Sequence, residues 1–489
     1  MSTMFIAGEW IGAAGGGTRQ VINPFDQSVV RTVDEGAEGD ALAAVAAARA
    51  AFDGGSWPDW TAQQRGELLG RIADLLQRDR DDIARLETLD TGKTLVESGI
   101  DVDDVTAVFR YYAHMSTAEP GRAVDTGDPS VVSRVVYEPV GVCALIAPWN
   151  YPLLQVSWKV APALAAGNSM VIKPSEITPL TTIRMVELIE EAGAPAGVVN
   201  LVLGAGPAVG VPLVSSPDVD LVSFTGGLST GQAIMRTAAD TVKKVALELG
   251  GKNPNVVFAD ADFDTAVDYA LTGVFLHAGQ VCSAGTRLIV EESVHDDFVA
   301  ELVSRAQRIR LGNGLDDDTE SGPLVSAEHL AKVESYVELG LKEGATLACG
   351  GQRPDEPELQ EGFFYRPTIF TGCTGDMRIV QEETFGPIMT VERFTGEDEA
   401  IALGNDTDYG LAGAVWTTDR GQAERVARRL RHGTIWINDF GPYLPQAEWG
   451  GFKRSGIGRE LGRAGLDEYR EAKHVYENTA PKAQRWFAR

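Results

Sequence analysis

One cysteine in this chain lies in a segment that could expose a reactive thiol. Cys282 belongs to the stretch Phe275–Arg287 (FLHAGQVCSAGTR), where small and polar residues follow an apolar run. A structural cysteine normally packs as a small hydrophobe inside a strand or helix, whereas Gly279 and Gly285 leave the backbone here uncrowded. A thiolate presented in such a loop can attack an electrophile. We therefore favour a nucleophile over an ordinary loop cysteine.

Other side chains suited to this chemistry follow predicted strands or precede the cysteine. Asn150 offers an amide that can stabilise a developing oxyanion, although a turn asparagine explains it equally well. Glu248 stands before two glycines and can act as a general base if it is partly buried. A salt-bridged or turn carboxylate is the common alternative for a single glutamate. His277, five residues before the cysteine, would be the base if the protein were a cysteine hydrolase without a cofactor.

Residues typical of a dinucleotide site occupy further strand ends. Lys173 can contact ribose or phosphate oxygens, and Glu176 can bind both hydroxyls of a ribose, although Ser-Glu here could also cap a helix. Because the Glu176 charge disfavours a 2′-phosphate, NAD is favoured over NADP. Gly226 and Gly227 open a predicted helix, where backbone amides can approach a pyrophosphate. The segment 204–210 (GAGPAVG) has its third glycine one position late for the dinucleotide fingerprint and is weak evidence.

Alternating strands and helices would position these side chains. The predicted strands are Val131–Val136, Val140–Ile146, Ser169–Ile172, Val198–Leu203, Asp220–Phe224, Val242–Leu249, Asn255–Phe258 and Arg287–Val290. The predicted helices are Glu38–Phe52, Thr61–Asp90, Ile177–Ala192 (closed by Gly193), Phe263–Leu276 and Ser293–Ile309. This order predicts an α/β fold with a parallel sheet covered by helices on both faces. Because the alternation restarts at Asn253, we expect a second α/β domain. Gly312–Asp318 is a predicted surface loop.

Composition excludes several partner classes. The chain has 489 residues, enough for roughly two to four domains, and a formal net charge of −27. That charge argues against nucleic acid and anionic membranes as partners. The N-terminus lacks the pattern of a secretory signal, and no apolar run is long enough to span a membrane. Four widely spaced cysteines argue against a disulfide scaffold and a metal site, so we expect a cytoplasmic protein without metal.

Seven segments, taken together, resemble the aldehyde dehydrogenase superfamily. In chain order they are APWNYP (147–152), KPSE (173–176), FTGG (224–227), LELGGKN (247–253), GQVCSAGTR (279–287), EETFGP (382–387) and GGFKRSGIGRELG (450–462). They follow the family's order and cover almost the whole chain. The resemblance implies NAD-dependent oxidation of an aldehyde to a carboxylic acid, through a thiohemiacetal and a thioester on Cys282.

The same resemblance implies individual roles. Asn150 and the Cys282 backbone N–H would hold the oxyanion, and Glu248 would activate the hydrolytic water. Lys159 and Glu460 match a pair that some relatives use as a proton relay, although a structural ion pair is equally compatible. The implied cofactor contacts are Ala147, Pro148, Trp149, Lys173, Ser175, Glu176, Gly206, Phe224, Gly226, Gly227, Thr230, Leu249, Gly250, Glu383 and Phe385.

Within the superfamily, the chain is most similar to the betaine aldehyde branch, whose product is glycine betaine. A trimethylammonium substrate implies an aromatic cage, for which Tyr151, Trp158 and Trp449 occupy suitable positions. Leu276 is a departure, because some members carry tryptophan there. Asp439 and Glu448 could add negative potential at the tunnel mouth. An ω-aminoaldehyde such as 4-aminobutanal or 4-trimethylaminobutanal is the alternative substrate, and a generic aliphatic aldehyde comes third.

The family architecture implies a three-part chain. A Rossmann-type NAD-binding domain would cover 1–117 and 139–250, and a catalytic domain 251–449. An oligomerisation element would combine 118–138 with 468–489, where Val475, Tyr476, Trp486 and Phe487 are apolar. We therefore expect a homodimer or homotetramer. Some relatives use potassium, but no carboxylate cluster here demands it.

Overall fold

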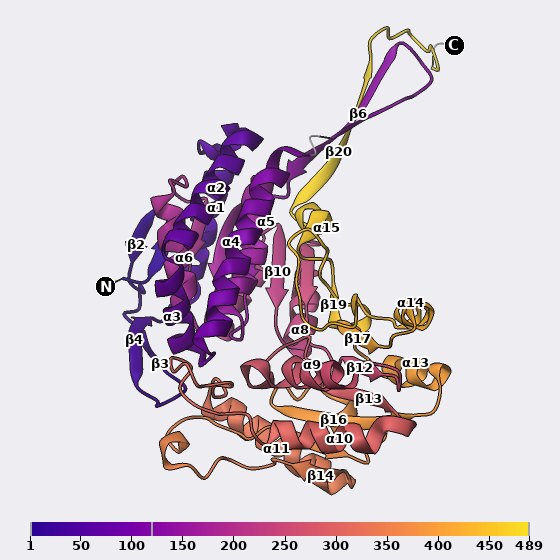
Figure 1. The fold of residues 1–489 in the computed structure, drawn as a ribbon. Coiled ribbons are helices and arrows are strands. Elements are labelled where there is room, and N and C mark those ends of the chain that lie inside the picture. The colour runs from indigo at the N-terminus through magenta and orange to yellow at the C-terminus, as the bar shows by residue number, and fades with distance from the viewer. Residues whose placement is uncertain (1, 119–120, 488–489) are drawn as a thin grey trace.

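The computed structural model describes residues 2–118 and 121–487, and its largest element is an eight-stranded sheet (Figure 1). The strand order is β19-β11-β10-β7-β8-β9-β1-β2, in which β9, β8, β7, β10 and β11 are parallel and the edge strands are antiparallel. The bounds are β1 Met4–Ile6, β2 Glu9–Ile11, β7 Val142–Ile146, β8 Ser169–Lys173, β9 Val199–Leu201, β10 Leu221–Thr225, β11 Lys244–Glu248 and β19 Gly456–Ile457. The parallel core confirms the sequence prediction, although the strands predicted at 140–146, 198–203 and 242–249 are two or three residues longer than β7, β9 and β11.

Helices cover both faces of this sheet, as predicted. The crossovers α5 (Pro152–Ala166) and α6 (Leu180–Glu191) pack together on one face, whereas α1 (Glu38–Gly54), α7 (Val211–Ser215) and α8 (Leu228–Ala238) form the other layer. An outer layer over α5 and α6 contains α2 (Ala62–Arg78), α3 (Arg80–Thr91) and α4 (Leu95–Ala118). Among the described residues, no helix combines the length and the apolarity needed to cross a membrane.

The observed helices differ from the predicted ones in two places. The single helix predicted for Thr61–Asp90 is wrong, because Asp79 leaves helical geometry (φ −101°, ψ 16°) and separates α2 from α3. Its carboxylate accepts hydrogen bonds from the guanidinium groups of Arg78 and Arg184, which favours the break. The helix α4 was not predicted. Its buried residues include Glu97 and Asp101 beside apolar ones, so the sequence shows no clean amphipathic stripe.

A second, seven-stranded sheet carries the strand order β14-β15-β16-β13-β12-β17-β18, parallel except for the pair β14–β15. Its strands are β12 Pro254–Val257, β13 Arg287–Glu291, β14 Thr346–Cys349, β15 Thr368–Thr371, β16 Ile388–Phe394, β17 Ala412–Trp416 and β18 Thr434–Ile437. Its helices are α9 Phe263–Phe275, α10 Glu292–Ala306, α11 Ala327–Glu343, α12 Arg378–Gln381, α13 Glu397–Asn405 and α14 Arg420–Arg429. The sequence predicted the helices and strands of this sheet only as far as residue 310. The segment 312–318 beyond them is a loop, as expected.

A three-stranded sheet forms an arm that projects from the body, with the last described residues near its tip (Figure 1). It contains β5 (Arg122–Val124), β6 (Val131–Pro139) and β20 (Arg470–Asn478), and β20 pairs with β6 along its whole length, from Arg470↔Pro139 to Asn478↔Val131. The sequence expectation of an oligomerisation element falls on this arm, apart from 119–120 and 488–489, which lie outside the described residues. A hairpin of β3 (Thr18–Ile22) and β4 (Val29–Asp34) and the short helix α15 (Gly462–Asp467) complete the fold.

Candidate active site

The strand order of the first sheet reverses between β7 and β10, which is where open α/β sheets bind ligands beyond the carboxyl ends of their strands. Two adjoining cavities, of about 200 and 500 Å³, lie at this edge. Both are lined by Pro148 and Trp149 after β7 and by the end of β10 with Gly226 and Gly227. The two cavities together therefore form one site with two compartments.

The larger compartment collects the predicted cofactor residues that follow β7, β8, β9 and β10. Its lining includes Ala147, Pro148, Trp149, Lys173, Ser175, Glu176, Gly206, Phe224, Gly226, Gly227 and Thr230. The ammonium of Lys173 lies 3.3 Å from the Glu176 carboxylate, and burial lowers the pKa of Lys173.

Local backbone features of this compartment fit a nucleotide. A Cβ at Gly226 would lie 2.4 Å from the Phe224 ring, so only glycine fits there, whereas Gly227 opens α8 with free space around its Cα. The N-terminal amides of α8 thus border a cleft wide enough for an anionic group. The buried Lys173 and the Glu176 carboxylate, at the carboxyl end of β8 on the same edge of the sheet, add the donors and acceptors that a ribose requires.

The smaller compartment brings together Cys282, Glu248 and Asn150, which come from three distant parts of the chain. Its lining also includes the predicted cofactor residues Leu249, Gly250, Glu383 and Phe385. The Gly251 N–H donates to the Glu383 carboxylate at 3.1 Å, and a Cβ on Gly250 would lie 2.1 Å from the same carboxylate. Glycine at position 250 therefore lets this carboxylate reach the cavity wall.

The thiol of Cys282 is half-buried in a loop that leads into β13. Burial raises the pKa of Cys282, and the nearby carboxylates of Glu383 and Glu248 raise it further, whereas the backbone N–H groups of Cys282 and Ser283 act in the opposite direction. The side-chain amide of Asn253 donates to the Cys282 carbonyl at 2.9 Å and fixes the backbone at the nucleophile. The thiol thus needs a proton acceptor before it can react.

Glu248 is placed to be that acceptor. Its carboxylate is buried, and one oxygen, Oε2, has no hydrogen-bond partner among the described residues. Burial raises the pKa of Glu248 well above its usual range, and the charge of Glu460 raises it further. A carboxyl group with a raised pKa that faces a cavity is suited to general acid–base catalysis near neutral pH.

Lys159 and Glu460 form a fully buried ion pair beside Glu248 rather than in the cavity lining. The Lys159 ammonium also donates to the Thr225 hydroxyl at 2.7 Å, and Thr225 lines both compartments. The pair acts on Glu248 electrostatically, because Glu460 raises the Glu248 pKa and Lys159 lowers it.

His277 does not face the thiol. Its ring packs edge-on against Tyr151 at 5.5 Å between centroids, and its Nε2 has no partner among the described residues. Burial holds the pKa of His277 well below 6.5, so the ring is neutral. The side-chain amide of Asn150 instead donates to the Gln280 carbonyl at 2.9 Å, close to the cysteine in sequence. This arrangement removes the basis for a Cys–His hydrolase pair.

An aromatic cluster lies next to the nucleophile. Trp449 contacts Tyr443 (4.8 Å between ring centroids), Trp158 (6.3 Å) and Trp436 (6.2 Å, stacked). The Tyr443 hydroxyl hydrogen-bonds the Ser283 hydroxyl at 2.6 Å, one residue after Cys282. Trp158 and Trp449 were predicted as substrate residues, whereas Tyr443 and Trp436 were missed. The density of aromatic residues between positions 436 and 449 was the signal that could have found them.

None of the predicted substrate residues belongs to the lining of the compartment that contains Cys282: Tyr151, Trp158, Leu276 and Trp449. One face of the Tyr151 ring is occupied by the ammonium of Lys93, 3.7 Å from the centroid. Leu276 is 40% exposed and lines a separate surface cavity, so the structure does not bring it into the compartment of Cys282. Asp439 and Glu448 also lie outside the lining of both compartments.

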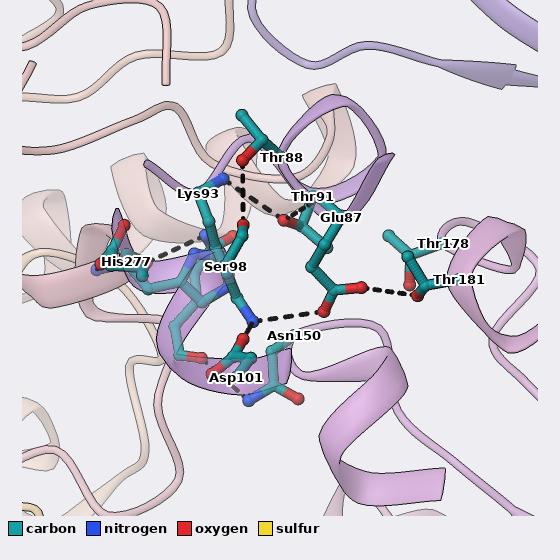
Figure 2. A network of polar contacts seen from close by, with 12 residues as sticks. Glu87, Thr88, Thr91, Lys93, Ser98, Asp101, Asn150, Thr178, Thr181 and His277 are labelled. Carbon is teal, nitrogen blue, oxygen red and sulfur yellow. Dashed lines mark hydrogen bonds and ion pairs between the residues drawn. The ribbon is translucent and has the colours of Figure 1, made fainter. Parts of the chain in front are cut away.

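The Lys93 ammonium belongs to a buried network that the sequence did not reveal. Figure 2 shows Lys93 between the carboxylates of Asp101 and Glu87, with Asn150 and His277 beside it. Glu87 also accepts a hydrogen bond from the Thr181 hydroxyl at 2.5 Å. The network therefore links α3 and α4 to the loop after β7 and to α6.

Comparisons with known proteins agree over nearly the whole chain. A model of the aldehyde dehydrogenase family matches residues 10–475. Betaine aldehyde dehydrogenase of Bacillus subtilis (strain 168) is 61% identical over 485 residues, which is 99% of each chain. The peroxisomal aminoaldehyde dehydrogenase 2 of Pisum sativum is 42% identical over 99% of this chain and 97% of that protein. A crystal structure of betaine aldehyde dehydrogenase from Staphylococcus aureus in complex with NAD+ is 55% identical, with a TM-score of 0.98 over 99% of this chain and 96% of that chain.

Proposed function

This chain belongs to the aldehyde dehydrogenase family, and we propose that it oxidises betaine aldehyde to glycine betaine with NAD. The observation that carries the proposal is the compartment in which Cys282, Glu248 and Asn150 meet, with the aromatic cluster one residue beyond the cysteine. The relative from Bacillus subtilis that bears the betaine aldehyde dehydrogenase name supports the substrate. The relative from Staphylococcus aureus that was solved with NAD+ supports the cofactor.

We propose a role for each of the three residues Cys282, Glu248 and Asn150. Glu248 takes the proton of the Cys282 thiol, and the thiolate sulfur bonds to the aldehyde carbon while the carbonyl oxygen becomes an oxyanion. The second N–H of the Asn150 amide and the Cys282 backbone N–H stabilise that oxyanion. Loss of hydride from the thiohemiacetal carbon leaves a thioester. Glu248 releases the first proton to solvent and is again a carboxylate; it then removes a proton from water, the hydroxide attacks the thioester, and the Cys282 thiolate leaves.

Bound NAD supplies the hydride acceptor for this reaction. The larger compartment would hold the adenosine end through Lys173 and Glu176, and the α8 amides at Gly227 would be available to the pyrophosphate. Glu383 and Phe385 lie on the wall of the smaller compartment and would hold the nicotinamide ribose and ring beside Cys282. The Glu176 carboxylate disfavours a 2′-phosphate, which favours NAD over NADP.

A cationic substrate is favoured by the charges behind the aromatic cluster. Tyr443 has a raised pKa because of burial and the nearby Cys282, and the charges of Asp101 and Asp104 raise it further. Burial raises the pKa of Asp104 to about 6, so this carboxylate is ionised above that pH. Asp101 is paired with the buried ammonium of Lys93, so Asp104 supplies the negative potential beside the cluster that contains Trp449 and Trp158. A cation on an aromatic face gains roughly 0.5–2 kcal/mol.

An ω-aminoaldehyde is the second candidate substrate. The relative from Pisum sativum named aminoaldehyde dehydrogenase 2 supports it, and so does Asp104, whose charge attracts a primary ammonium as well as a quaternary one. The fully substituted trimethylammonium cannot donate hydrogen bonds, so a wall of aromatic rings suits it better than a carboxylate alone.

We also propose that the protein works as a homodimer or homotetramer held by the arm. The tip of the arm exposes Trp486 (80%) and Phe487 (93%), and Tyr476 on β20 is 60% exposed. Large apolar side chains gathered on a projecting element mark a protein interface, and a second copy of the chain presents the same surface. A cytoplasmic location is part of the same proposal.

Steady-state kinetics with a panel of aldehydes tests the substrate assignment. We expect the highest kcat/KM for betaine aldehyde, a lower value for 4-aminobutanal, and the lowest for hexanal, measured by NADH absorbance. Trp449→Ala should raise KM for betaine aldehyde by roughly 2- to 30-fold and leave KM for propanal within twofold. A preference for hexanal, or equal effects of Trp449→Ala on both substrates, would refute a cation site.

A further inference from the structure

The nucleophile is preceded by a strained turn. His277 and Ala278 adopt left-handed backbone geometry (φ 47° and 52°), and Gly279 follows with φ 74°. For residues with a Cβ this conformation is costly, so consecutive examples persist only where the surroundings enforce them. The turn is buried throughout. It sets the direction in which the chain enters Gln280 and Cys282.

One buried carboxylate holds this turn from outside. Glu97 Oε1 accepts the backbone N–H of His277 at 2.7 Å, across 180 residues of sequence. Its Oε2 accepts the backbone N–H and the hydroxyl of Thr94, at 2.7 and 2.8 Å. The Glu97 backbone N–H returns a bond to the Thr94 hydroxyl, so the two residues form a capping box at the start of α4. One carboxylate oxygen of Glu97 therefore caps the N-terminus of α4, and the other accepts the hydrogen bond from the turn.

From the turn, hydrogen bonds continue to the reacting groups. The Gln280 side chain donates to the His277 carbonyl at 3.1 Å and accepts the Val325 N–H at 2.9 Å. The Gln280 carbonyl accepts the Asn150 amide at 2.9 Å. A Cβ at Gly279 would lie 2.1 Å from the Gly386 carbonyl, so the turn also touches the segment after Phe385. A shift of the turn would displace the thiol and the Asn150 amide together.

We propose that Glu97 is a positioning residue for the nucleophile: by holding the His277 amide, it maintains the left-handed turn that places Cys282 and Asn150 against the aldehyde. Figure 2 shows His277 and Asn150 beside the Lys93 network. In the same network the hydroxyl of Thr88 in α3 hydrogen-bonds the hydroxyl of Ser98 in α4 (Figure 2). The N-terminal end of α4 is thereby anchored to α3, which gives Glu97 a rigid base. The catalytic consequence rests on the proposed dehydrogenase function.

The test is Glu97→Gln, which preserves size but cannot accept from both Thr94 and His277, because an amide offers one acceptor oxygen. We expect kcat to fall by about 10²-fold, since small displacements of reacting groups cost that much. KM for the aldehyde and the Kd for NAD should change little, because the aromatic cluster and the larger compartment lie on other elements. Glu97→Asp, too short to bridge both partners, should behave in the same way.

Thiol alkylation measures the positioning without any turnover. Cys143, Cys349 and Cys373 are buried, so iodoacetamide reports on Cys282. In Glu97→Gln we expect slower alkylation and a higher pH midpoint, because the backbone N–H groups that favour the thiolate are displaced. This readout requires neither aldehyde nor NAD. If the wild-type protein failed to oxidise aldehydes, the proposed function would be refuted, but the alkylation assay would still test whether Glu97 positions Cys282.

Two matched variants separate positioning from helix stability. Thr94→Val removes part of the capping box but keeps the Glu97–His277 bond, so its kcat and alkylation midpoint should equal those of the wild type. Ala278→Gly relaxes the left-handed strain, and in the Glu97→Gln background it should recover about tenfold of the lost kcat. Equal losses in Thr94→Val and Glu97→Gln, an unaltered alkylation midpoint in Glu97→Gln, or no recovery with Ala278→Gly would each overturn the proposal.

Discussion

At the residue scale, Glu248 shows how the site exchanges stability for reactivity. Its carboxylate is buried with one oxygen lacking a partner among the described residues, and Glu460 lies near enough to disfavour its ionised form. A group in such surroundings costs folding free energy whenever it is charged. The same surroundings raise its pKa and make it a base that can take a proton from the thiol or from water.

Glu248→Gln should therefore stabilise the fold while abolishing efficient turnover. The folded-state pKa is raised above the unfolded value, so the folded protein holds the proton more tightly, and stability is lost as pH rises from the unfolded pKa through the folded one. The variant lacks this loss. We expect little difference in the free energy of unfolding at pH 5, and a gain on the order of 1–3 kcal/mol at pH 8, measured by chemical denaturation.

The control for this prediction is Glu477→Gln on the exposed part of β20. Its free energy of unfolding should match that of the wild type at both pH values. A gain for Glu248→Gln that is equally large at pH 5 would mean that ionisation of Glu248 is not the cause.

At the element scale, the arm of β5, β6 and β20 is a separate three-stranded sheet that projects from the body of the chain (Figure 1). The strands β6 and β20 are bonded along nine residue pairs but stand away from the body (Figure 1). The side chains of β20 are mostly exposed. Apolar residues at the end of such an element are costly in water unless another surface covers them.

Replacing both Trp486 and Phe487 by serine should weaken self-association. We expect the molar mass measured by light scattering after size-exclusion chromatography to fall toward that of a smaller species at micromolar concentration. Val242→Ser, which changes an equally exposed apolar residue (89%) outside the arm, should leave the mass unchanged. An unchanged mass in the double variant would exclude the tip of the arm from the interface.

At the scale of the whole molecule, the net charge of −27 surrounds a site proposed to accept a cation. Long-range attraction raises the encounter rate of oppositely charged ligands and is screened by salt, with a Debye length of about 10 Å at 0.1 M and about 3 Å at 1 M. Asp101 is paired with Lys93, but the charge of Asp104 acts on Tyr443 of the aromatic cluster and extends this field into the site. A neutral aldehyde experiences no such attraction.

The predicted consequence is a substrate-specific salt effect. Between about 0.1 M and 1 M NaCl, kcat/KM for betaine aldehyde should fall by roughly 3- to 10-fold, whereas kcat/KM for propanal should stay nearly constant. Initial rates at low substrate concentration measure both. A parallel decline for the two substrates would mean that salt acts on the enzyme itself and not on substrate encounter.

The sequence alone predicted the alternation of strands and helices before residue 310, although it missed α4, and the residues at the strand ends. Strand ends, glycines and a helix N-terminus are local patterns, which is why the order of residues was enough to predict that Lys173, Glu176, Gly226 and Gly227 lie at one edge of the sheet, and all four line one cavity. The later part of the chain remained unassigned, because its short strands are buried on both faces and lack alternation. The order of the motifs, which resembles one family, added the roles of Cys282 and Glu248 as expectations.

Only the tertiary structure decided which side chains meet. Glu97 and His277 are separated by 180 residues, yet one hydrogen bond joins them. Lys93 covers a face of Tyr151, a ring that the sequence analysis predicted to contact the substrate. Leu276 was expected at the substrate, but the helix ends before it and the following turn directs it to the surface. Periodicity and motif order record local geometry, whereas contacts across the chain depend on how sheets and loops pack. That packing is why the surroundings of Cys282 became visible only in three dimensions.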